Sequence, residues 1–269
     1  MNRTAWMLVA VSLGLVPTSA VAQRDLTTVT RVNLRTGSNR SSAVKRVLPA
    51  GTHLLWTGAM SDREGMLKAV TANPPRHTGW VAGEYLVEGA PAAGQHGAAA
   101  GACGVLRWPV KTMSDADANA VNRTPAGVTI ASLRALVAPK VRPQNARANA
   151  VEKTEFGVSG QVIMWGQEAD QDLHLVLADE HNASRTIVLE VPDPSCVSGA
   201  SAAVRDSIGQ ARQNVIQALG TPPQRVTALT TPVRVTVTGV GFFDFGHSTG
   251  HPPNAFELHP VLSIRLGTH

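Results

Sequence analysis

The feature that most constrains the fold is a small-residue segment at residues 89–102, which divides the chain into two blocks. Most of it, residues 90–102, reads APAAGQHGAAAGA and has no apolar periodicity, which predicts a flexible linker. A chain of 269 residues has room for two small domains. We therefore expect one domain at residues 24–88 and a second at residues 103–267.

Residues 1–22 predict a signal peptide. Arg3 gives a short positive region, and residues 5–16 form an apolar stretch that is too short to span a bilayer. Ala20 and Ala22 place small residues where a signal peptidase needs them, which predicts cleavage after Ala22. No later segment has the roughly 20 apolar residues of a transmembrane helix. We therefore expect a periplasmic or secreted protein of a bacterial envelope.

The chain has two cysteines, Cys103 and Cys196. In an oxidising compartment an even pair favours a disulfide, and two separately buried thiols are the alternative. Two cysteines are too few for a zinc site of the zinc-finger kind.

The formal net charge of +5 is a modest basic excess that is spread along the chain. A basic balance can attract nucleic acid, anionic lipid or acidic wall polymers. No run of Lys and Arg of the nucleic-acid-binding type occurs. We therefore expect a solvated basic surface and do not expect nucleic acid as the partner.

The first block predicts a small β-barrel. Its short apolar or alternating runs are separated by turn clusters, and so many strands in so short a block are typical of such a barrel. Leu34, Val47 and Trp80 are the side chains that we expect to fill its core. The predicted strands lie at residues 28–33, 44–48, 53–57, 66–70 and from residue 79 onward.

Three motifs in this block resemble bacterial SH3 (SH3b) domains. Residues 32–38, VNLRTGS, are similar to the LNVRxGPS segment, and residues 49–52, PAGT, match a later turn. Residues 79–81, GWV, followed by Tyr85 and Leu86, resemble the closing GWV…YL segment. The resemblance implies an SH3-like barrel that binds cell-wall peptide or serves as a passive accessory module.

The second block predicts three strands, a helix and two more strands, which is the order of an OB-like barrel. Residues 202–219 are the strongest helical segment, because apolar residues recur along one face and Gly220 can end the helix. A second helix is expected at residues 128–137, with Thr129 as its N-cap. The predicted strands lie at residues 155–165, 173–178, 186–191, 233–243 and 256–266. The chain is therefore expected to be mainly β, with an SH3-like small barrel followed by an OB-like β-barrel domain that carries one or two helices.

Four polar residues lie before or within the second of these strands, namely Glu168, Asp170, Asp172 and His174. Alternate side chains of a strand share a face, so the last three would point the same way. Neighbouring carboxylates repel each other unless a divalent metal ion or an arginine lies between them. The alternative is a solvated acidic loop followed by a histidine with a capping role.

A second polar set lies near the end of the chain, in a stretch rich in glycine and proline. Glu257 and His259 alternate on the last predicted strand and share a face. Imidazole and carboxylate groups are preferred ligands of Zn, Mn or Fe and the usual general acid–base pair, but no HExxH-type motif is present. The alternative is a surface loop whose His and Asn side chains fix backbone turns. The set consists of Asp244, His247, His251, Asn254, Glu257 and His259.

We expect the two sets to meet across the barrel with Glu190 nearby, because burying so many ionisable groups requires metal or hydrogen-bonded partners. A separation of more than about 12 Å would end this hypothesis. One divalent metal ion is the cofactor that such a cluster would hold. The metal-ligand candidates are Asp170, Asp172, His174, His247, Glu257 and His259, and the catalytic candidates are Asp172, His174, Glu190, Glu257 and His259.

The second block also resembles a set of bacterial proteins that share the pattern ExDxDxH … EVPDPxC … TGVxFFDxxH … NxxELHPV. Here these pieces are residues 168–174, 190–196, 238–247 and 254–261. That set is uncharacterised, so the resemblance implies no activity.

Two function hypotheses follow from the sequence. The first is an exported, non-catalytic envelope protein whose SH3b-like module binds peptidoglycan, or another envelope polymer or protein, while the second domain binds a ligand. The second is a metal-dependent hydrolase, nuclease-like or acting on the cell wall, that uses the Asp/His/Glu cluster. A bound metal ion and a loss of activity on substitution of the cluster would distinguish the second hypothesis from the first.

Overall fold

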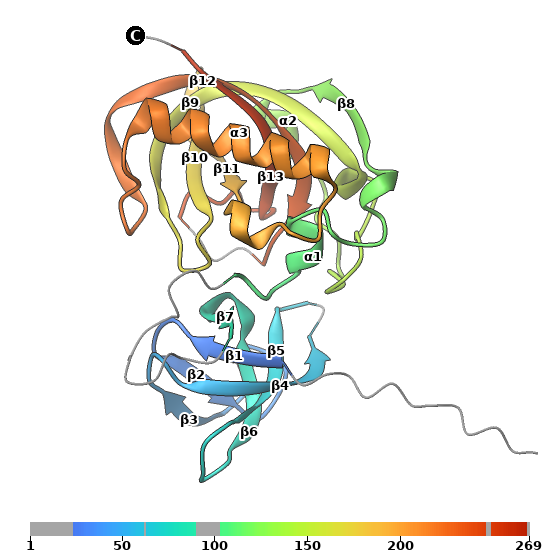
Figure 1. Cartoon of the computed structure of the whole chain (residues 1–269), viewed down its shortest axis with the longest axis vertical. Coiled ribbons are helices and arrows are strands. Elements are labelled where there is room, and N and C mark those ends of the chain that lie inside the picture. The colour runs from blue at the N-terminus through green and yellow to red at the C-terminus, as the bar shows by residue number, and fades with distance from the viewer. Residues whose placement is uncertain (1–23, 62, 90–102, 246–248, 268–269) are drawn as a thin grey trace, which may run out of the picture.

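The computed structural model describes residues 24–61, 63–89, 103–245 and 249–267. The fold is mainly β and consists of two β-rich modules that lie one above the other in Figure 1. The predicted signal peptide, and all but the first residue of the predicted linker, lie outside the described residues. No helix in the described part of the chain is long and apolar enough to cross a bilayer.

The first module is a seven-stranded sheet in which neighbouring strands are antiparallel. Its strands are β1 (Arg24–Thr28), β2 (Val32–Arg35), β3 (Val44–Leu48), β4 (His53–Met60), β5 (Met66–Thr71), β6 (Thr78–Ala82) and β7 (Leu86–Glu88). The sheet order is β3-β2-β6-β5-β4-β1-β7. The sheet curves around an apolar core that includes Leu26, Leu34 and Leu54, and a short 3-10 helix, η1 (Gly83–Tyr85), precedes β7.

Two details of the first module differ from the sequence-based prediction. The predicted strand at residues 28–33 is broken, because β1 pairs with β4 and β7 whereas β2 pairs with β3 and β6, so the chain turns between them. Val47, a predicted core residue, is 45% exposed because β3 lies at the edge of the sheet and turns Leu48 inward instead. Leu34 is buried as predicted, and Trp80 is half-buried.

The second module contains the predicted series of three strands, a helix and two strands, and an additional strand, β8, precedes it. Its strands are β8 (Asn122–Gly127), β9 (Thr154–Gln167), β10 (Leu173–Asp179), β11 (Asn182–Val191), β12 (Thr227–Phe243) and β13 (Phe256–Leu266). β9 pairs with β10 and β12, β10 pairs with β11, and β13 pairs with β12 and, in parallel, with β11. These five strands therefore close into an OB-like barrel, and β8 is added beside β9.

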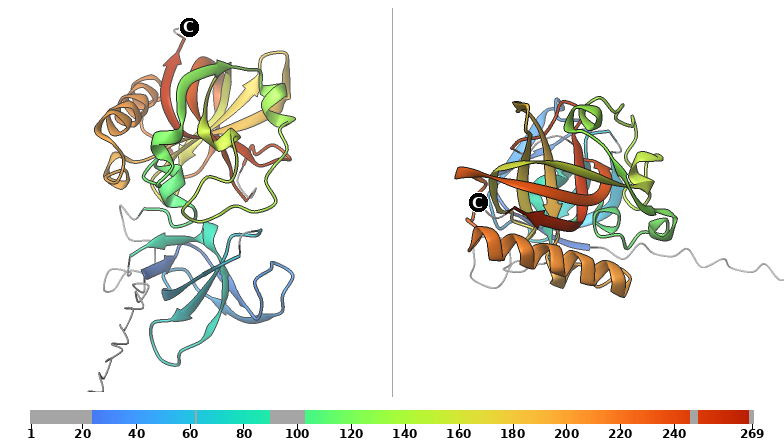
Figure 2. Two further views of the ribbon diagram at one scale, coloured as in Figure 1. Left: turned by 90° about the vertical axis from the view of Figure 1, so that its right-hand side faces the viewer. Right: turned by 90° about the horizontal axis from the view of Figure 1, so that it is seen from above.

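The long helix α3 (Ala202–Leu219) begins and ends where the sequence predicts. The Ser201 hydroxyl accepts a hydrogen bond from the backbone N–H of Val204 at 3.4 Å, which satisfies one free donor at the N-terminus. Gly220 follows the helix with a φ of 86°, a conformation that glycine adopts without strain. α3 packs against β13 on one side of the barrel (Figure 2).

The other predicted helix is shorter than expected. α2 (Ile130–Arg134) covers half of residues 128–137, and Thr129 caps it as predicted, in a reciprocal pair with Ser132. A further one-turn helix, α1 (Trp108–Lys111), was not predicted. It places Lys111 at the junction of the two modules, beside the candidate site.

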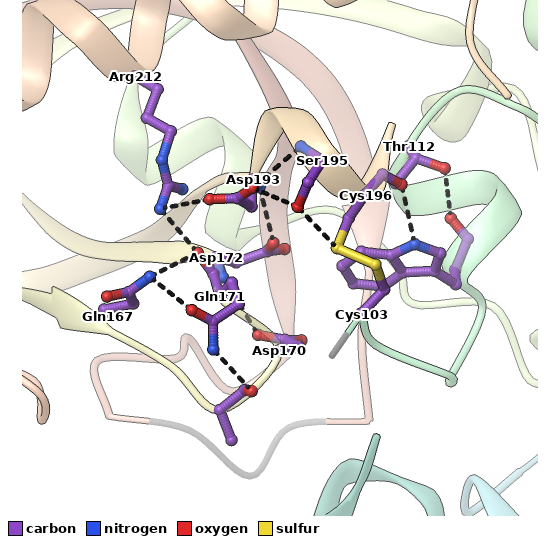
Figure 3. Close-up of a disulfide and its surroundings, with 12 residues drawn as sticks. Cys103, Thr112, Gln167, Asp170, Gln171, Asp172, Asp193, Ser195, Cys196 and Arg212 are labelled. Atoms are coloured by element: carbon purple, nitrogen blue, oxygen red, sulfur yellow. Dashed lines mark hydrogen bonds and ion pairs between the residues drawn. A yellow bond between two sulfur atoms is a disulfide. The ribbon is translucent and has the colours of Figure 1, made fainter. Parts of the chain in front are cut away.

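The predicted disulfide between Cys103 and Cys196 is present. It ties the start of the second module to the 3-10 helix η4 (Pro194–Cys196), directly after β11 (Figure 3). The cysteines are 93 residues apart, and closing so long a loop contributes about 4–5 kcal/mol in the chain-entropy account. Cys103 also contacts the first module, because the backbone N–H of Glu88 donates to the Cys103 carbonyl at 2.9 Å.

Candidate metal centre

A small cavity of about 40 Å³ lies at the end of the barrel that faces the first module. Its volume suits a hydrated ion better than an organic ligand, since each water needs roughly 10–15 Å³. Six carboxyl side chains line it but only one lysine and one histidine. The carboxyl groups belong to Glu84, Glu168, Asp170, Asp172, Glu190 and Asp244, and the basic groups to Lys111 and His259.

His174 is held between two of these carboxyl groups. It lies directly opposite Glu190 in the β10–β11 pair, and its Nδ1 is 2.6 Å from Glu190 Oε1 and 3.2 Å from Glu168 Oε1. Its Nε2 is 2.8 Å from the Thr249 carbonyl, an acceptor that fixes the hydrogen on Nε2. The Nδ1 atom therefore faces the carboxylates, in the manner of a metal-ligating histidine whose other nitrogen is held by a carbonyl.

Together these three residues have the spacing of a metal site. Glu168, His174 and Glu190 each offer one ligand atom, and these three atoms lie within 4.8 Å of one another. Zinc and manganese accept this mixture of imidazole nitrogen and carboxylate oxygen. The three residues come from the β9–β10 connection and from two adjacent strands, so the barrel itself sets their distances.

A second set of contacts links the last strand to the same cavity. His259 Nε2 is 3.2 Å from Asp172 Oδ2, and His259 Nδ1 is 3.3 Å from Glu257 Oε2. His251 Nε2 is 2.8 Å from the other oxygen of Glu257. The result is a chain of alternating imidazole and carboxylate groups that ends at Asp172, a residue that is 1% exposed.

Burial and charge shift the pKa values of this cluster in both directions: burial would raise the pKa values of Glu168 and Glu257, but hydrogen bonds and charge interactions with His174 and His251, respectively, lower them. Burial would lower the pKa of His174, but the charge of Glu190 and hydrogen bonds to Glu168 and Glu190 raise it well above its usual value. Burial raises the pKa of Glu190 well above its usual value, and burial together with the charges of Asp172 and Glu168 raises the pKa of Asp170 to about 7. A cluster with this many acids therefore holds protons that a cation would displace.

The pKa of His259 also reflects the negative charge around it. Burial would lower the pKa of this imidazole, but its interactions with the carboxylates of Asp172 and Glu257 raise it to about 9. Clusters of perturbed ionisable groups are typical of functional sites.

Several buried polar atoms at the cavity lack a hydrogen-bond partner within the described residues. They are Glu84 Oε2, Asp172 Oδ2, Glu190 Oε2 and His259 Nε2. The Asp172 and His259 atoms are close to each other but lack the geometry of a hydrogen bond. Leaving such a group unsatisfied costs about 1–3 kcal/mol, and more if it is charged. Atoms of this kind around one cavity are what an ion or its bound water would satisfy.

Neighbouring side chains fix the position of Asp172. Its Oδ1 accepts a hydrogen bond from the backbone N–H of Asp193 at 3.4 Å. Arg212 in turn pairs with Asp193 at 3.2 Å and donates to the carbonyls of Val191 and Gln171 (Figure 3). The helix α3, which carries Arg212, therefore braces the loop that presents Asp172 to the cavity.

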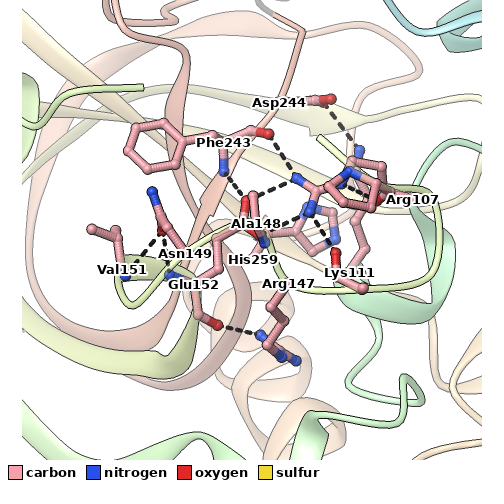
Figure 4. Close-up of polar contacts among 12 residues, drawn as sticks. Arg107, Lys111, Arg147, Ala148, Asn149, Val151, Glu152, Phe243, Asp244 and His259 are labelled. Carbon is pink, nitrogen blue, oxygen red and sulfur yellow. Dashed lines mark hydrogen bonds and ion pairs between the residues drawn. The ribbon is translucent and has the colours of Figure 1, made fainter. Parts of the chain in front are cut away.

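A buried network supports the other wall of the cavity (Figure 4). Arg107 makes two hydrogen bonds of 2.8 Å to the carboxylate of Glu152, and both side chains are fully buried. The Arg107 guanidinium lies 4.6 Å from the centroid of the Phe242 ring, and that ring lies 5.6 Å from the His259 ring. Lys111 pairs with Asp244 at 3.1 Å.

The structure brings together nearly all of the predicted site residues. Asp170, Asp172, His174, Glu190, Glu257 and His259 lie at the cavity or in direct contact with residues that line it. Of the other polar residues singled out in the sequence, Glu168, Asp244 and His251 also join the cluster. Asn254 has a different role, because its side chain donates to the carbonyls of Leu133 and Leu136 and so holds α2. His247 lies outside the described residues.

Two charged residues of the cavity were not predicted, Lys111 and Glu84. Lys111 lies in a short helix that has no charge pattern of its own, and Glu84 belongs to the other module. Neither the sequence around Lys111 nor that around Glu84 carries a pattern that links these residues to the polar sets near residues 170 and 257. The position of Glu84 depends on how the two modules pack, and that of Lys111 on how α1 folds against the barrel.

A wider groove of about 430 Å³ runs between the modules and adjoins the cavity. The two share four lining residues, Glu84, Leu86, Glu168 and Asp170. Tyr85 and Arg225 lie on opposite modules and line the groove as well. A ligand in this groove would therefore lie next to the carboxylate cluster.

No protein-family model, curated protein or solved structure matches the chain. The function therefore has to be inferred from the chemistry of the cluster and its surroundings.

Proposed function

We propose that the protein is an exported cell-envelope protein whose second module binds one divalent metal ion, and that this ion helps to bind a ligand in the groove between the modules. The observation that carries the proposal is the placement of Glu168, His174 and Glu190 around a common point, with their ligand atoms within 4.8 Å of one another. In this proposal the first module is an SH3b-like domain that binds wall peptide.

The charge of the cavity supports a cation. Six carboxyl groups face one lysine and one histidine in a small space, and buried carboxylates require compensating charge. The donor set of imidazole and carboxylate fits Zn²⁺ or Mn²⁺ better than Ca²⁺ or Mg²⁺, which prefer oxygen ligands alone. The metal would add two positive charges to the cluster.

The groove supports ligand binding beside the metal. Its lining combines an exposed tyrosine, Tyr85, with the side chain of Arg225, and two carboxylates of the cluster form part of its wall. A wall peptide carries free carboxylate groups that suit a bound cation and an arginine. The groove is therefore a suitable site for peptidoglycan peptide, or for another envelope polymer or protein.

Adding excess Zn²⁺ or Mn²⁺ to metal-free protein is expected to raise the melting temperature. A ligand that binds only the folded state at 100 times its Kd stabilises by about 2.7 kcal/mol, which corresponds to roughly 5–10 °C for a chain of this size. Thermal unfolding with and without metal, together with the metal content of protein purified from the periplasm, measures this. Absence of both a stoichiometric metal and a shift in melting temperature would rule out the proposal.

A second candidate function, a metal-dependent hydrolase, is favoured by the His251–Glu257–His259–Asp172 chain. An imidazole oriented by a carboxylate is a common arrangement for general acid–base catalysis, and here Glu257 contacts His259 in this way. If the protein is a hydrolase, His259→Gln should lower the rate of hydrolysis of peptidoglycan or of a phosphodiester about 100-fold or more while metal binding persists. Assays of wild-type, metal-loaded protein that detect no product from either polymer would eliminate this candidate.

A further inference from the structure

The cavity has one acidic side chain that comes from the first module. Glu84 lies in η1, and its side chain is only 3% exposed. Its Oε1 accepts a hydrogen bond of 2.5 Å from Arg40 Nη1. Its Oε2 is buried at the cavity and has no hydrogen-bond partner within the described residues.

The packing of the modules holds η1 against the second module. The N–H of Gly83 donates to the Gly65 carbonyl at 2.8 Å, which fixes η1 to the preceding hairpin. A Cβ atom on Gly83 would lie 3.2 Å from a methyl group of Leu106 in the second module, so the backbone of η1 packs closely against the Leu106 side chain. A β-bridge between Val87 and Gly104 continues this contact. Glu84 is therefore held in place by backbone packing.

The pair with Arg40 alone does not account for the burial of Glu84. The Arg40 side chain is 39% exposed, so this pair could form at the surface with little cost in desolvation. Instead, one carboxylate oxygen is removed from water and left without a donor, which is unfavourable unless another positive group is present. Arg40 orients the carboxylate, as partners behind a metal ligand commonly do.

We propose that Glu84 supplies an oxygen ligand from the first module to the metal ion in the cavity, directly or through one bound water. This inference rests on the proposed function, because it requires that the second module binds a metal ion. The ion would then be held by both modules, and metal binding would fix the groove that lies between them. The first module would thus complete the site as well as binding its own partner.

Isothermal titration of the full-length, metal-free protein with ZnCl₂ tests this proposal. Glu84→Gln keeps the size of the side chain and removes its charge, and we expect it to weaken zinc binding 10- to 100-fold. Glu88→Gln is the matched control: the same substitution in the same module, at a residue whose pair with Arg24 is exposed. Its zinc affinity should stay within about twofold of that of the wild type.

A further variant, Arg40→Met, separates the metal role from a structural role. It breaks the same salt bridge but leaves the Glu84 carboxylate in place, so it should weaken zinc binding less than Glu84→Gln does. Equal zinc affinity in Glu84→Gln and Glu88→Gln would overturn the inference, and so would equal weakening in Glu84→Gln and Arg40→Met. Absence of zinc binding by the wild type would overturn the proposed function and this inference with it.

Discussion

Replacing His174 with alanine is expected to reduce the affinity for Zn²⁺ or Mn²⁺ about 100-fold or more. Residues that only orient a metal ligand typically account for 10- to 100-fold, so a direct ligand should account for at least the upper end. His174 is completely buried, and its Nδ1 is the imidazole atom closest to Glu168 and Glu190. Titration calorimetry on the metal-free protein would measure the change.

The matched control for this prediction is His181→Ala. His181 is exposed and lies in the turn that joins β10 to β11, the same two strands that carry His174 and Glu190. Its replacement should leave the metal affinity unchanged. If His174→Ala, shown to be folded by circular dichroism, binds the metal as tightly as His181→Ala, then His174 is not a ligand.

Replacing Glu152 with glutamine is expected to destabilise the protein by about 3–5 kcal/mol, because breaking a buried ion pair leaves an uncompensated charge. The Glu152 carboxylate receives hydrogen bonds from both terminal nitrogens of Arg107 and from the backbone N–H groups of Ala148 and Phe243. Arg107 is 0% exposed and would be left with its charge in the interior. Urea-induced unfolding at neutral pH gives the change in the free energy of unfolding.

The control again uses Glu88, whose pair with Arg24 has both side chains more than a third exposed. Exposed pairs contribute about 0–1 kcal/mol, so Glu88→Gln should have a small effect. Replacing both members of the buried pair, as Arg107→Met with Glu152→Leu, should cost less than the sum of the two single changes. A Glu152→Gln variant as stable as Glu88→Gln would contradict the role given to this network.

The order of the five barrel strands and α3 could be predicted because each carries a local signal. β13 and α3 begin and end at the residues that alternation and helical periodicity predict. An N-cap at Ser201 and a glycine after the last turn mark α3 on both sides. Strand–strand–strand–helix–strand–strand order was then enough to predict the barrel.

The convergence of the site could be predicted for the same reason. Asp172 and His174 lie two positions apart at the start of β10, and Glu257 and His259 are two positions apart on β13. Such spacing places each pair on one side of its strand, and a closed barrel brings these sides together. The predicted meeting of the two sets agrees with the contact of 3.2 Å between His259 and Asp172.

Other features depend on long-range packing and left no signal in the sequence. Val47 is apolar, as core residues usually are, but it is exposed because β3 lies at the edge of the sheet. β8 contains few apolar residues and pairs with β9 at the edge of the sheet. Glu84 meets the cluster because the modules pack together, and Lys111 meets it because α1 folds back onto the barrel, and no local pattern predicts either contact.

The most direct test of the central claim is the position of a bound metal ion in crystals of the zinc-loaded protein, located by anomalous scattering at the zinc edge. We predict one peak in the cavity, about 2.0–2.2 Å from His174 Nδ1 and from carboxylate oxygens of Glu168 and Glu190. A crystal in which these three side chains coordinate no ion, or in which zinc binds only elsewhere on the protein, would contradict the account.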